Sequence, residues 1–300
     1  MTSWQTRITN FVLRRMKPTL AKKEGDQLVS FLRNQMAMSG DKTSKNTIID
    51  KVSIGGVGGE WVSVGDVPSN KALVYFHGGA YVSGSPVTHR DYAAAMAKAL
   101  GIKVLMVDYR LAPEYSFPAP IEDALVVYKA LLGEGYAAND LLVGGDSAGG
   151  NLTLCLLQKI RSFGLSMPAA ACLFSPWADL THAGNSMLTN ANSDPMLPMV
   201  MLERSADIYA AGADKNDPLI SPIFTDMTDF PPMIIHVGST EILLDDAKTI
   251  ADLCEQTGVD VTLKIWEKAP HAFPIMVKFL PEARAAIEQT AEFFRTKLNP

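Results

Sequence analysis

A serine surrounded by glycines, Ser147, is the residue of this chain best placed for covalent chemistry. It stands in the segment GGDSAGG at 144–150, directly after an apolar run at 141–143 and directly before a helical pattern at 151–161. A sharp turn from a strand into a helix needs small residues around the serine, and it leaves the serine hydroxyl exposed. The segment therefore predicts a nucleophilic serine on a strand–turn–helix element.

A second glycine-rich turn lies upstream and offers groups that would stabilise the reaction of such a serine. The apolar run 71–76 leads into the sequence HGGAY at 77–81. Acyl transfer passes through a negatively charged tetrahedral oxygen, and glycines let backbone N–H groups approach that oxygen closely. The two motifs, in this order, are typical of an α/β-hydrolase. We therefore expect the N–H groups of Gly78, Gly79 and Ala148 to form the oxyanion hole.

A serine nucleophile needs a base, and the order of an α/β-hydrolase triad, which is serine, acid, histidine, places that base after the last strand. His271 lies five residues beyond an apolar strand that ends at Trp266. The other histidines fall in the oxyanion turn, inside a strand or before the positions where the base is expected: His77, His89, His182 and His236. His271 is therefore the candidate general base.

Four segments together give the chain a resemblance to the hormone-sensitive-lipase family of esterases. These segments are HGGAYVSG at 77–84, DYRLAPE at 108–114, FPAP at 117–120 and GDSAGGN at 145–151. The likeness extends over residues 70–300, and the first forty residues share little of it. It implies an α/β-hydrolase fold, with a mostly parallel eight-stranded sheet, helices on both faces and a helical cap. It also implies a serine carboxylesterase that hydrolyses acyl esters through an acyl-enzyme intermediate.

The resemblance also indicates where the acid of the triad stands. After the next-to-last apolar strand the chain reads STEILLDD at 239–246, where the family usually has an aspartate, a proline, a leucine, a variable residue and a second aspartate. Aligned on that pattern, Glu241 takes the place of the acid and Asp245 that of the second aspartate. Glutamate can accept the histidine N–H as aspartate does. We expect a triad of Ser147, His271 and Glu241, with Asp245 as the alternative acid.

Apolar runs of strand length alternate with helical patterns along the chain, which indicates a mostly parallel sheet covered by helices on both faces. Only the glycine-rich residues 55–59 separate the first two runs, so we expect these two strands to form an antiparallel hairpin at one edge. The expected strands are 50–54, 60–65, 71–76, 103–108, 141–145, 169–174, 233–238 and 261–266. The expected helices are 88–100, 119–133, 147–162, 241–257 and 281–297.

Two segments, 1–40 and 179–225, depart from this alternation. The first has helical spacing of its apolar residues, and the second is a long excursion between two core strands that is rich in methionine and leucine. Such an excursion is usually functional, and methionine adapts to irregular apolar surfaces. In the related esterases these two segments form the cap over the active site, which leaves 41–178 and 226–300 as the two parts of the core. We expect this capped apolar site to favour short acyl chains.

Composition and cysteine usage are those of a globular enzyme. The 27 basic and 32 acidic residues give a net charge of −5, which argues against nucleic acid as a partner. Cys155, Cys172 and Cys254 are scattered and odd in number, as expected for buried thiols in a reducing compartment. No stretch approaches the ~20 apolar residues of a membrane span, and basic residues interrupt the N-terminal apolar pattern, unlike that of a signal peptide. We therefore expect a cytoplasmic protein.

The sequence carries no phosphate loop, dinucleotide turn or metal-spaced histidine cluster, so we expect neither an organic cofactor nor a metal. The expected partner is a small-molecule ester, and the family resemblance implies a homodimer through the edge strand 261–266. Two other functions stay open: an amidase or lactonase with the same triad, and a non-catalytic small-molecule receptor on the same fold. Plant relatives of the receptor type lack the triad histidine. The presence of both Ser147 and His271 therefore favours an enzyme.

Overall fold

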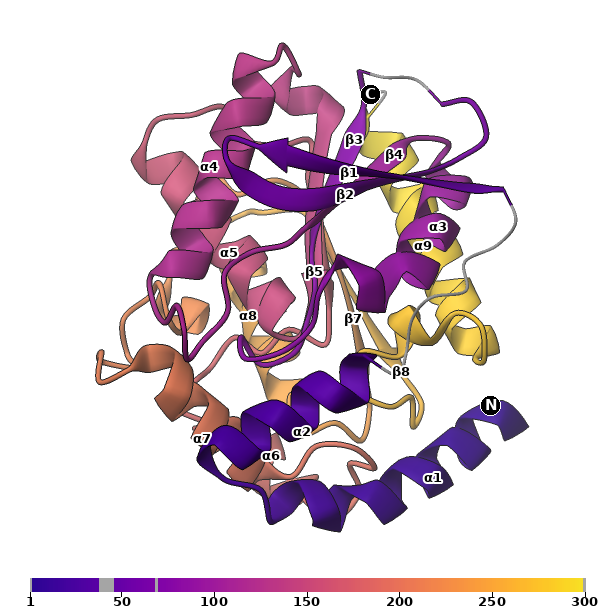
Figure 1. Cartoon of the computed structure of the whole chain (residues 1–300), viewed down its shortest axis with the longest axis vertical. Coiled ribbons are helices and arrows are strands. Elements are labelled where there is room, and N and C mark those ends of the chain that lie inside the picture. The colour runs from indigo at the N-terminus through magenta and orange to yellow at the C-terminus, as the bar shows by residue number, and fades with distance from the viewer. Residues whose placement is uncertain (1, 38–45, 68–69, 299–300) are drawn as a thin grey trace.

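A single mixed sheet forms the centre of the computed structural model, which describes residues 2–37, 46–67 and 70–298 (Figure 1). In this part of the chain, eight strands lie in the order β1-β2-β4-β3-β5-β6-β7-β8. Strands β3 to β8 are parallel to one another, whereas β2 runs antiparallel to both of its neighbours, β1 and β4. The sequence predicts a mostly parallel eight-stranded sheet with an antiparallel hairpin at one edge, and the structure has both features. The strands are β1 (Thr47–Ile54), β2 (Val57–Val64), β3 (Ala72–Phe76), β4 (Lys103–Val107), β5 (Leu141–Asp146), β6 (Ala170–Phe174), β7 (Met233–Gly238) and β8 (Val261–Trp266).

The hairpin of β1 and β2 lies at one edge of the sheet, as predicted, but its turn is shorter than the glycine-rich segment suggests. Ile54 pairs with Val57, so the turn consists of Gly55 and Gly56 alone. Both glycines have positive φ, +60° and +92°. Tight two-residue hairpin turns need that conformation, and it is open to glycine without strain. The remaining glycines of the segment therefore continue into β2.

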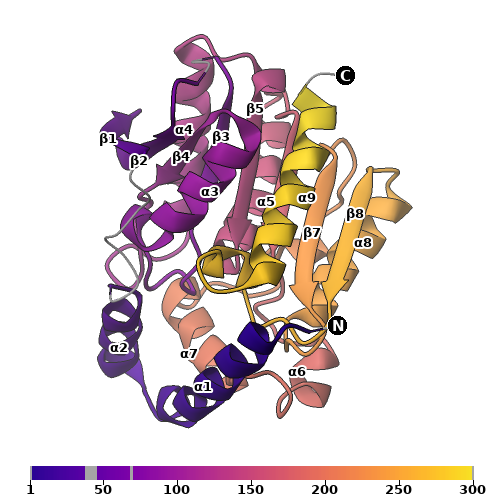
Figure 2. The same ribbon diagram turned by 90° about the vertical axis from the view of Figure 1, so that its right-hand side faces the viewer.

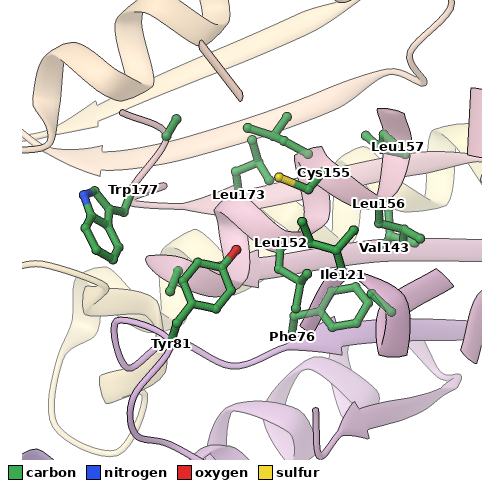
Figure 3. Close-up of a cluster of buried hydrophobic side chains, with 14 of the residues drawn as sticks. Phe76, Tyr81, Ile121, Val143, Leu152, Cys155, Leu156, Leu157, Leu173 and Trp177 are labelled. Carbon is green, nitrogen blue, oxygen red and sulfur yellow. The ribbon is translucent and has the colours of Figure 1, made fainter. Parts of the chain in front are cut away.

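The pleat of the parallel strands divides the core into two apolar layers. In β3, Val74 and Phe76 face one layer, and Leu73 and Tyr75 face the other. Helices α4 (Ala119–Gly133), α5 (Ala148–Ser162) and α8 (Leu244–Gln256) pack on the first layer, and α3 (Arg90–Leu100) and α9 (Pro281–Leu298) on the second. Both faces of the sheet are thus covered, as Figures 1 and 2 show. Figure 3 shows the first layer, where side chains from β3, β5 and β6 meet those of α5.

Two of these helices begin later than the sequence predicts. Helix α3 begins at Arg90 because Pro86–His89 forms a 3₁₀ turn, and α8 begins at Leu244 because the preceding residues form the turn that carries Glu241. In each case the apolar spacing of the helix continues into the turn, so spacing alone does not mark the boundary. The other short 3₁₀ turns are Ala138–Asp140, Pro222–Phe224 and Phe273–Met276.

The cap consists of α1 (Trp4–Ala21), α2 (Gly25–Ala37), α6 (Ser186–Thr189) and α7 (Met199–Ala210). These helices lie together beyond one end of the sheet, although about 150 residues of core separate the two pairs in sequence (Figures 1 and 2). The guanidinium of Arg204 on α7 donates to the carbonyl oxygens of Ala21 and Lys23 at 2.9 and 2.7 Å. The Lys17 ammonium donates to the Ala191 and Asp194 carbonyl oxygens. Hydrogen bonds between the two segments therefore hold the cap together.

Candidate active site

Ser147 follows β5 directly and precedes the first residue of α5. Its backbone has φ +54° and ψ −119°, a conformation that is strained for a residue with a side chain. The Ser147 N–H donates to the Phe174 carbonyl oxygen at 2.9 Å, which fixes the turn against the end of β6. A Cβ atom on Gly149 would collide with the Phe76 carbonyl oxygen on β3. The glycines of this segment therefore allow α5 to cross the sheet closely enough to hold the serine in this conformation.

His271 and Glu241 form a buried pair next to this turn. His271 Nδ1 lies 2.8 Å from Glu241 Oε2, and the two side chains are 5% and 0% exposed. Burial lowers the pKa of His271, but the hydrogen bond and the negative charge of Glu241 raise it, and the net shift is upward. This histidine thus differs from three others, whose pKa values are lowered by burial: His77 to about 3, His236 to about 3 and His182 to about 4.

Ser175 holds the pair in place, and the sequence analysis missed it. Its hydroxyl donates to Glu241 Oε1 at 2.7 Å and accepts from the Ala272 N–H at 3.0 Å. The Gly238 N–H donates to the same carboxylate oxygen. One hydroxyl therefore joins the acid to the loop of the histidine. A serine directly after β6 stands at the carboxyl end of a parallel strand, which is a signal that could have singled it out.

The two aspartates that follow Glu241 have other partners. Asp245 Oδ2 accepts from the Ser186 N–H at 2.8 Å, at the start of α6. Asp246 is buried and accepts from the N–H groups of Ala178 and Asp179. Both carboxylates thus hold the beginning of the 179–225 excursion against α8. Asp245 has a structural contact in the cap, while Glu241 contacts His271.

The oxyanion turn differs from the sequence expectation at Gly78. The Gly78 N–H donates to Asp146 Oδ1 at 3.0 Å, so the group that we expected in the oxyanion hole is already engaged. The next two residues, Gly79 and Ala80, have φ of +124° and +56°. Their N–H groups and that of Ala148 have no hydrogen-bond acceptor among the described residues. Three donors near the serine are therefore free to bind a ligand oxygen.

Asp146 is the residue that fixes the oxyanion turn. Its carboxylate is buried and also accepts from the Tyr75 hydroxyl at 3.0 Å, and it lies 3.2 Å from His89 Nε2. Burial alone would raise the pKa of Asp146, but His89 and the hydrogen bonds lower it below its ordinary value. An ionised acceptor thus binds the Gly78 N–H, which ties the oxyanion turn to the nucleophile turn.

A pocket of about 370 Å³ lies between the core and the cap. Ser147, His271, Gly79 and Ala80 are among the residues that line it. The cap and the loop after β8 supply a mostly apolar wall, formed by Leu13, Met16, Leu20, Phe31, Leu32, Met36, Met196, Leu197, Met201, Leu202, Ile275, Met276 and Phe279. The structure thus brings the serine and the histidine of the sequence analysis to one apolar cavity.

Three further findings concern metal sites, cysteines and membrane spans. In residues 2–37, 46–67 and 70–298, no group of three or more histidine, cysteine or acidic side chains could hold a metal ion. Cys155, Cys172 and Cys254 are unpaired and buried, and burial raises the pKa of each thiol. Among the described residues no helix is long and apolar enough to cross a membrane.

Comparison with known proteins places this geometry among esterases. The chain matches the alpha/beta hydrolase fold family over residues 73–275. It is 40% identical to an acetyl-hydrolase of Streptomyces hygroscopicus over 82% of each chain. An esterase from the bacterial hormone-sensitive lipase family superposes with a TM-score of 0.92 at 33% identity, over the whole of both chains. The crystal structure of EstE5 soaked with p-nitrophenyl butyrate superposes with a TM-score of 0.92 at 35% identity, over 99% of this chain and all of the other.

Proposed function

We propose that this chain, which belongs to the hormone-sensitive-lipase family of α/β-hydrolase carboxylesterases, hydrolyses its esters with Ser147 as nucleophile, His271 as general base and Glu241 as acid. The observation that carries the proposal is the 2.8 Å contact between His271 Nδ1 and Glu241 Oε2, beside a pocket that both Ser147 and His271 line. A base that is held by a buried carboxylate and shares a pocket with a strained serine is the arrangement that can activate a hydroxyl for acyl transfer.

The acylation step follows from the orientation of the histidine. Because Nδ1 of His271 is bonded to Glu241, Nε2 is the nitrogen that takes the proton of the Ser147 hydroxyl. The serine oxygen then forms a bond to the ester carbonyl carbon, and the carbonyl oxygen becomes an anion. When the tetrahedral species collapses, the bond to the alcohol oxygen breaks and the imidazolium gives its proton to the leaving alcohol. The product is an acyl group on Ser147.

Deacylation repeats these steps with water. His271 takes a proton from water, the water oxygen bonds to the acyl carbon, and the bond between this carbon and the serine oxygen breaks as the proton returns to Ser147. Glu241 stabilises the imidazolium in both halves of the reaction. His271 thus accepts and returns the proton in each half of the reaction. The products are the alcohol and the free acid, and Ser147 is restored.

We assign the oxyanion hole to the N–H groups of Gly79, Ala80 and Ala148. Gly78 leaves the set because its N–H donates to Asp146. Ala148 begins α5, and the first N–H groups of a helix lack acceptors within the helix. Each such donor contributes about 2.7–4 kcal/mol to the stabilisation of an oxyanion in acyl-transfer enzymes.

The substrate class that we propose is an ester with a short acyl chain. The pocket volume of about 370 Å³ lies at the lower end of the range for small-molecule sites, about 300–1,000 Å³. The relatives named an acetyl-hydrolase and an esterase soaked with p-nitrophenyl butyrate support the same size of acyl group. Hydrolysis of a p-nitrophenyl ester series should be fastest with acyl groups of a few carbons. A maximum at long acyl chains would contradict the proposal.

The test of the nucleophile is Ser147→Ala, with Ser162→Ala as the matched control. Ser162 lies at the other end of α5, and its exposed hydroxyl donates to the Lys159 carbonyl oxygen. We expect Ser147→Ala to lose p-nitrophenyl acetate hydrolysis to near background with an unchanged thermal unfolding temperature, and the control to retain full activity. Near-normal activity of the folded Ser147→Ala variant would refute the assignment. Assays of a lactone and an anilide beside the ester would identify a lactonase or an amidase with the same triad.

A further inference from the structure

One helix of the cap presents its apolar side chains to solvent. In α1, Trp4, Ile8, Phe11 and Val12 are 67%, 54%, 57% and 50% exposed, and Met16 is 40% exposed. Their spacing of three, four and eight residues places them along one face of the helix, which we call the α1 stripe. In both Figure 1 and Figure 2, α1 lies at the outer edge of the molecule. The stripe therefore presents five exposed apolar side chains on the outer side of the molecule.

Buried polar residues of α1 form hydrogen bonds to the rest of the protein, while Leu13 and Leu20 of the same helix line the pocket. The buried Thr6 hydroxyl donates to Glu282 Oε2 at 2.9 Å, and the buried Asn10 amide donates to the Lys268 carbonyl oxygen at 2.8 Å. A surface helix of a globular protein ordinarily turns its most apolar face to the core, whereas the stripe of α1 is exposed. Polar contacts thus help to fix the helix in its place, and Met16 is the member of the stripe that lines the pocket.

The charged residues of α1 itself are all positive. Residues 2–23 contain six arginines and lysines and no acidic residue, in a chain whose net charge is −5. Arg7, Arg14 and Arg15 are exposed, and none of them forms an ion pair with a carboxylate in the described part of the chain. The Arg15 guanidinium lies 4.3 Å from the centre of the Phe11 ring, so a cation borders the stripe directly.

The stripe adjoins the mouth of the active-site pocket. Met16 belongs to the stripe and also lines the pocket, and Leu13 and Leu20 line the pocket from the same helix. Phe279, which is 69% exposed, lines the pocket from the loop that precedes α9. If the stripe rests on an apolar surface, a molecule that moves from this surface into the pocket has a short path to Ser147.

We propose that the α1 stripe docks the enzyme on an anionic lipid surface. A helix with aromatic and aliphatic residues on one face and arginines beside them lies in the plane of such a surface, with its apolar side chains among the acyl chains and its cations on the headgroups. A second copy of the chain suits this face less, because a symmetric contact would bring the arginines of both copies together. The acidic remainder of the chain is repelled by the same surface, which orients the pocket mouth toward the lipid.

The test is flotation of the protein with vesicles made of equal parts phosphatidylglycerol and phosphatidylcholine. The measurement uses the Ser147→Ala variant, so that no lipid is hydrolysed and the result is independent of the proposed function. We expect binding to these vesicles, weaker binding to vesicles of phosphatidylcholine alone, and loss of binding as salt is raised. Equal binding to both kinds of vesicle, or binding to neither, would overturn the proposal.

Variants locate the binding on α1. The pair Ile8→Ser and Phe11→Ser, neither of which lines the pocket, should weaken vesicle binding by about tenfold or more. The double variant Arg7→Ala and Arg15→Ala should weaken vesicle binding by roughly tenfold or more, because each charge contributes about fivefold.

Controls of the same kind are Ile48→Ser and Phe163→Ser, which are exposed elsewhere, and Lys51→Ala on β1. An equal loss in the controls would overturn the proposal. So would a change in sedimentation of the α1 variants without vesicles, since this would identify an interface between copies.

Discussion

Among the single residues of the site, Glu241 has the most specific set of contacts. One of its carboxylate oxygens binds His271, and the other accepts from the Ser175 hydroxyl and the Gly238 N–H. A buried carboxylate with these contacts holds the imidazole in one tautomer. The acid of the triad is thus positioned by two elements, the end of β7 and the end of β6.

The first prediction separates the two candidate acids. Glu241→Gln should lower kcat on the order of 10⁴-fold, the loss seen when the acid of such a triad becomes an amide, because the histidine then takes the wrong tautomer. Asp245→Asn should change kcat little, since this carboxylate accepts from the Ser186 N–H in the cap. Steady-state kinetics of both variants on p-nitrophenyl acetate provides the comparison. The opposite ranking would transfer the role of the acid to Asp245.

The second prediction concerns pH. The pKa of His271 is raised above its ordinary value of 6.5, and only the neutral imidazole can act as the base. The value of kcat/KM should therefore fall as the pH decreases, with a midpoint above 6.5. The measurement is a pH profile of kcat/KM for p-nitrophenyl acetate. A midpoint below 6.5 would contradict the account of how Glu241 and His271 interact.

The third prediction concerns Ser175 as a positioning residue. Ser175→Ala removes the hydroxyl that joins Glu241 to the Ala272 N–H, so kcat should fall by about tenfold, with little change in KM. Ser221→Ala is the matched control, because Ser221 is also buried and also joins two backbone groups, the Leu180 N–H and the Lys215 carbonyl oxygen. If both variants lose stability alike and keep kcat, Ser175 has only a structural role.

For single residues, the sequence predicts those that belong to a local motif. It misses roles that depend on tertiary contacts. Ser147 and His271 follow from glycine spacing and chain order, and both line the pocket. The engagement of Gly78 by Asp146 could not be predicted, because it depends on how two turns from different strands approach each other. The contacts of Ser175 also depend on residues far along the chain, although its place directly after a predicted strand can be seen in the sequence.

At the scale of elements, the cap depends on a few hydrogen bonds between segments that are distant in sequence. Arg204 on α7 binds the carbonyl oxygens at the end of α1 and in the connection to α2, and it forms an ion pair with Glu24. These bonds satisfy backbone groups that a helix end leaves without partners. One side chain of the insertion therefore fixes the N-terminal helices over the pocket.

The fourth prediction follows from this contact. Arg204→Ala should loosen the connection between α1 and α2, so trypsin should cleave after Lys22 or Lys23 faster than in the unmodified protein, and KM should rise. Arg161→Ala is the control, because Arg161 also donates to a backbone carbonyl oxygen, that of Thr228, away from the cap. Equal cleavage rates in both variants would show that Arg204 does not fix the cap.

Strands and helices of the core could be predicted to within a few residues, because apolar periodicity reports burial directly. The hairpin turn was the main exception, since glycines within β2 look the same in sequence as glycines in a turn. The family resemblance places 179–225 in the cap, but the course of this segment could not be predicted from the spacing of its apolar residues. Its apolar residues serve both the pocket wall and the packing of α7, so no single period appears.

At the scale of the whole molecule, β8 ends the sheet and pairs only with β7 among the described strands. An edge strand of this kind exposes unpaired backbone groups. We propose, as the family resemblance implies, that two copies of the chain join through this edge. Sedimentation equilibrium should then give twice the chain mass of 32.5 kDa. A monomer at all concentrations would contradict the proposal, and the cytoplasmic location stays a prediction.

The central claim is that Ser147 becomes covalently bound during turnover, and labelling with diethyl p-nitrophenyl phosphate tests it most directly. In this reaction the serine oxygen bonds to phosphorus and p-nitrophenolate leaves. We expect one diethylphosphoryl group per chain, mapped by peptide mass spectrometry to Ser147, with parallel loss of esterase activity and no labelling in His271→Ala. Activity lost through a label on any other residue, or retained with Ser147 fully labelled, would contradict the mechanism.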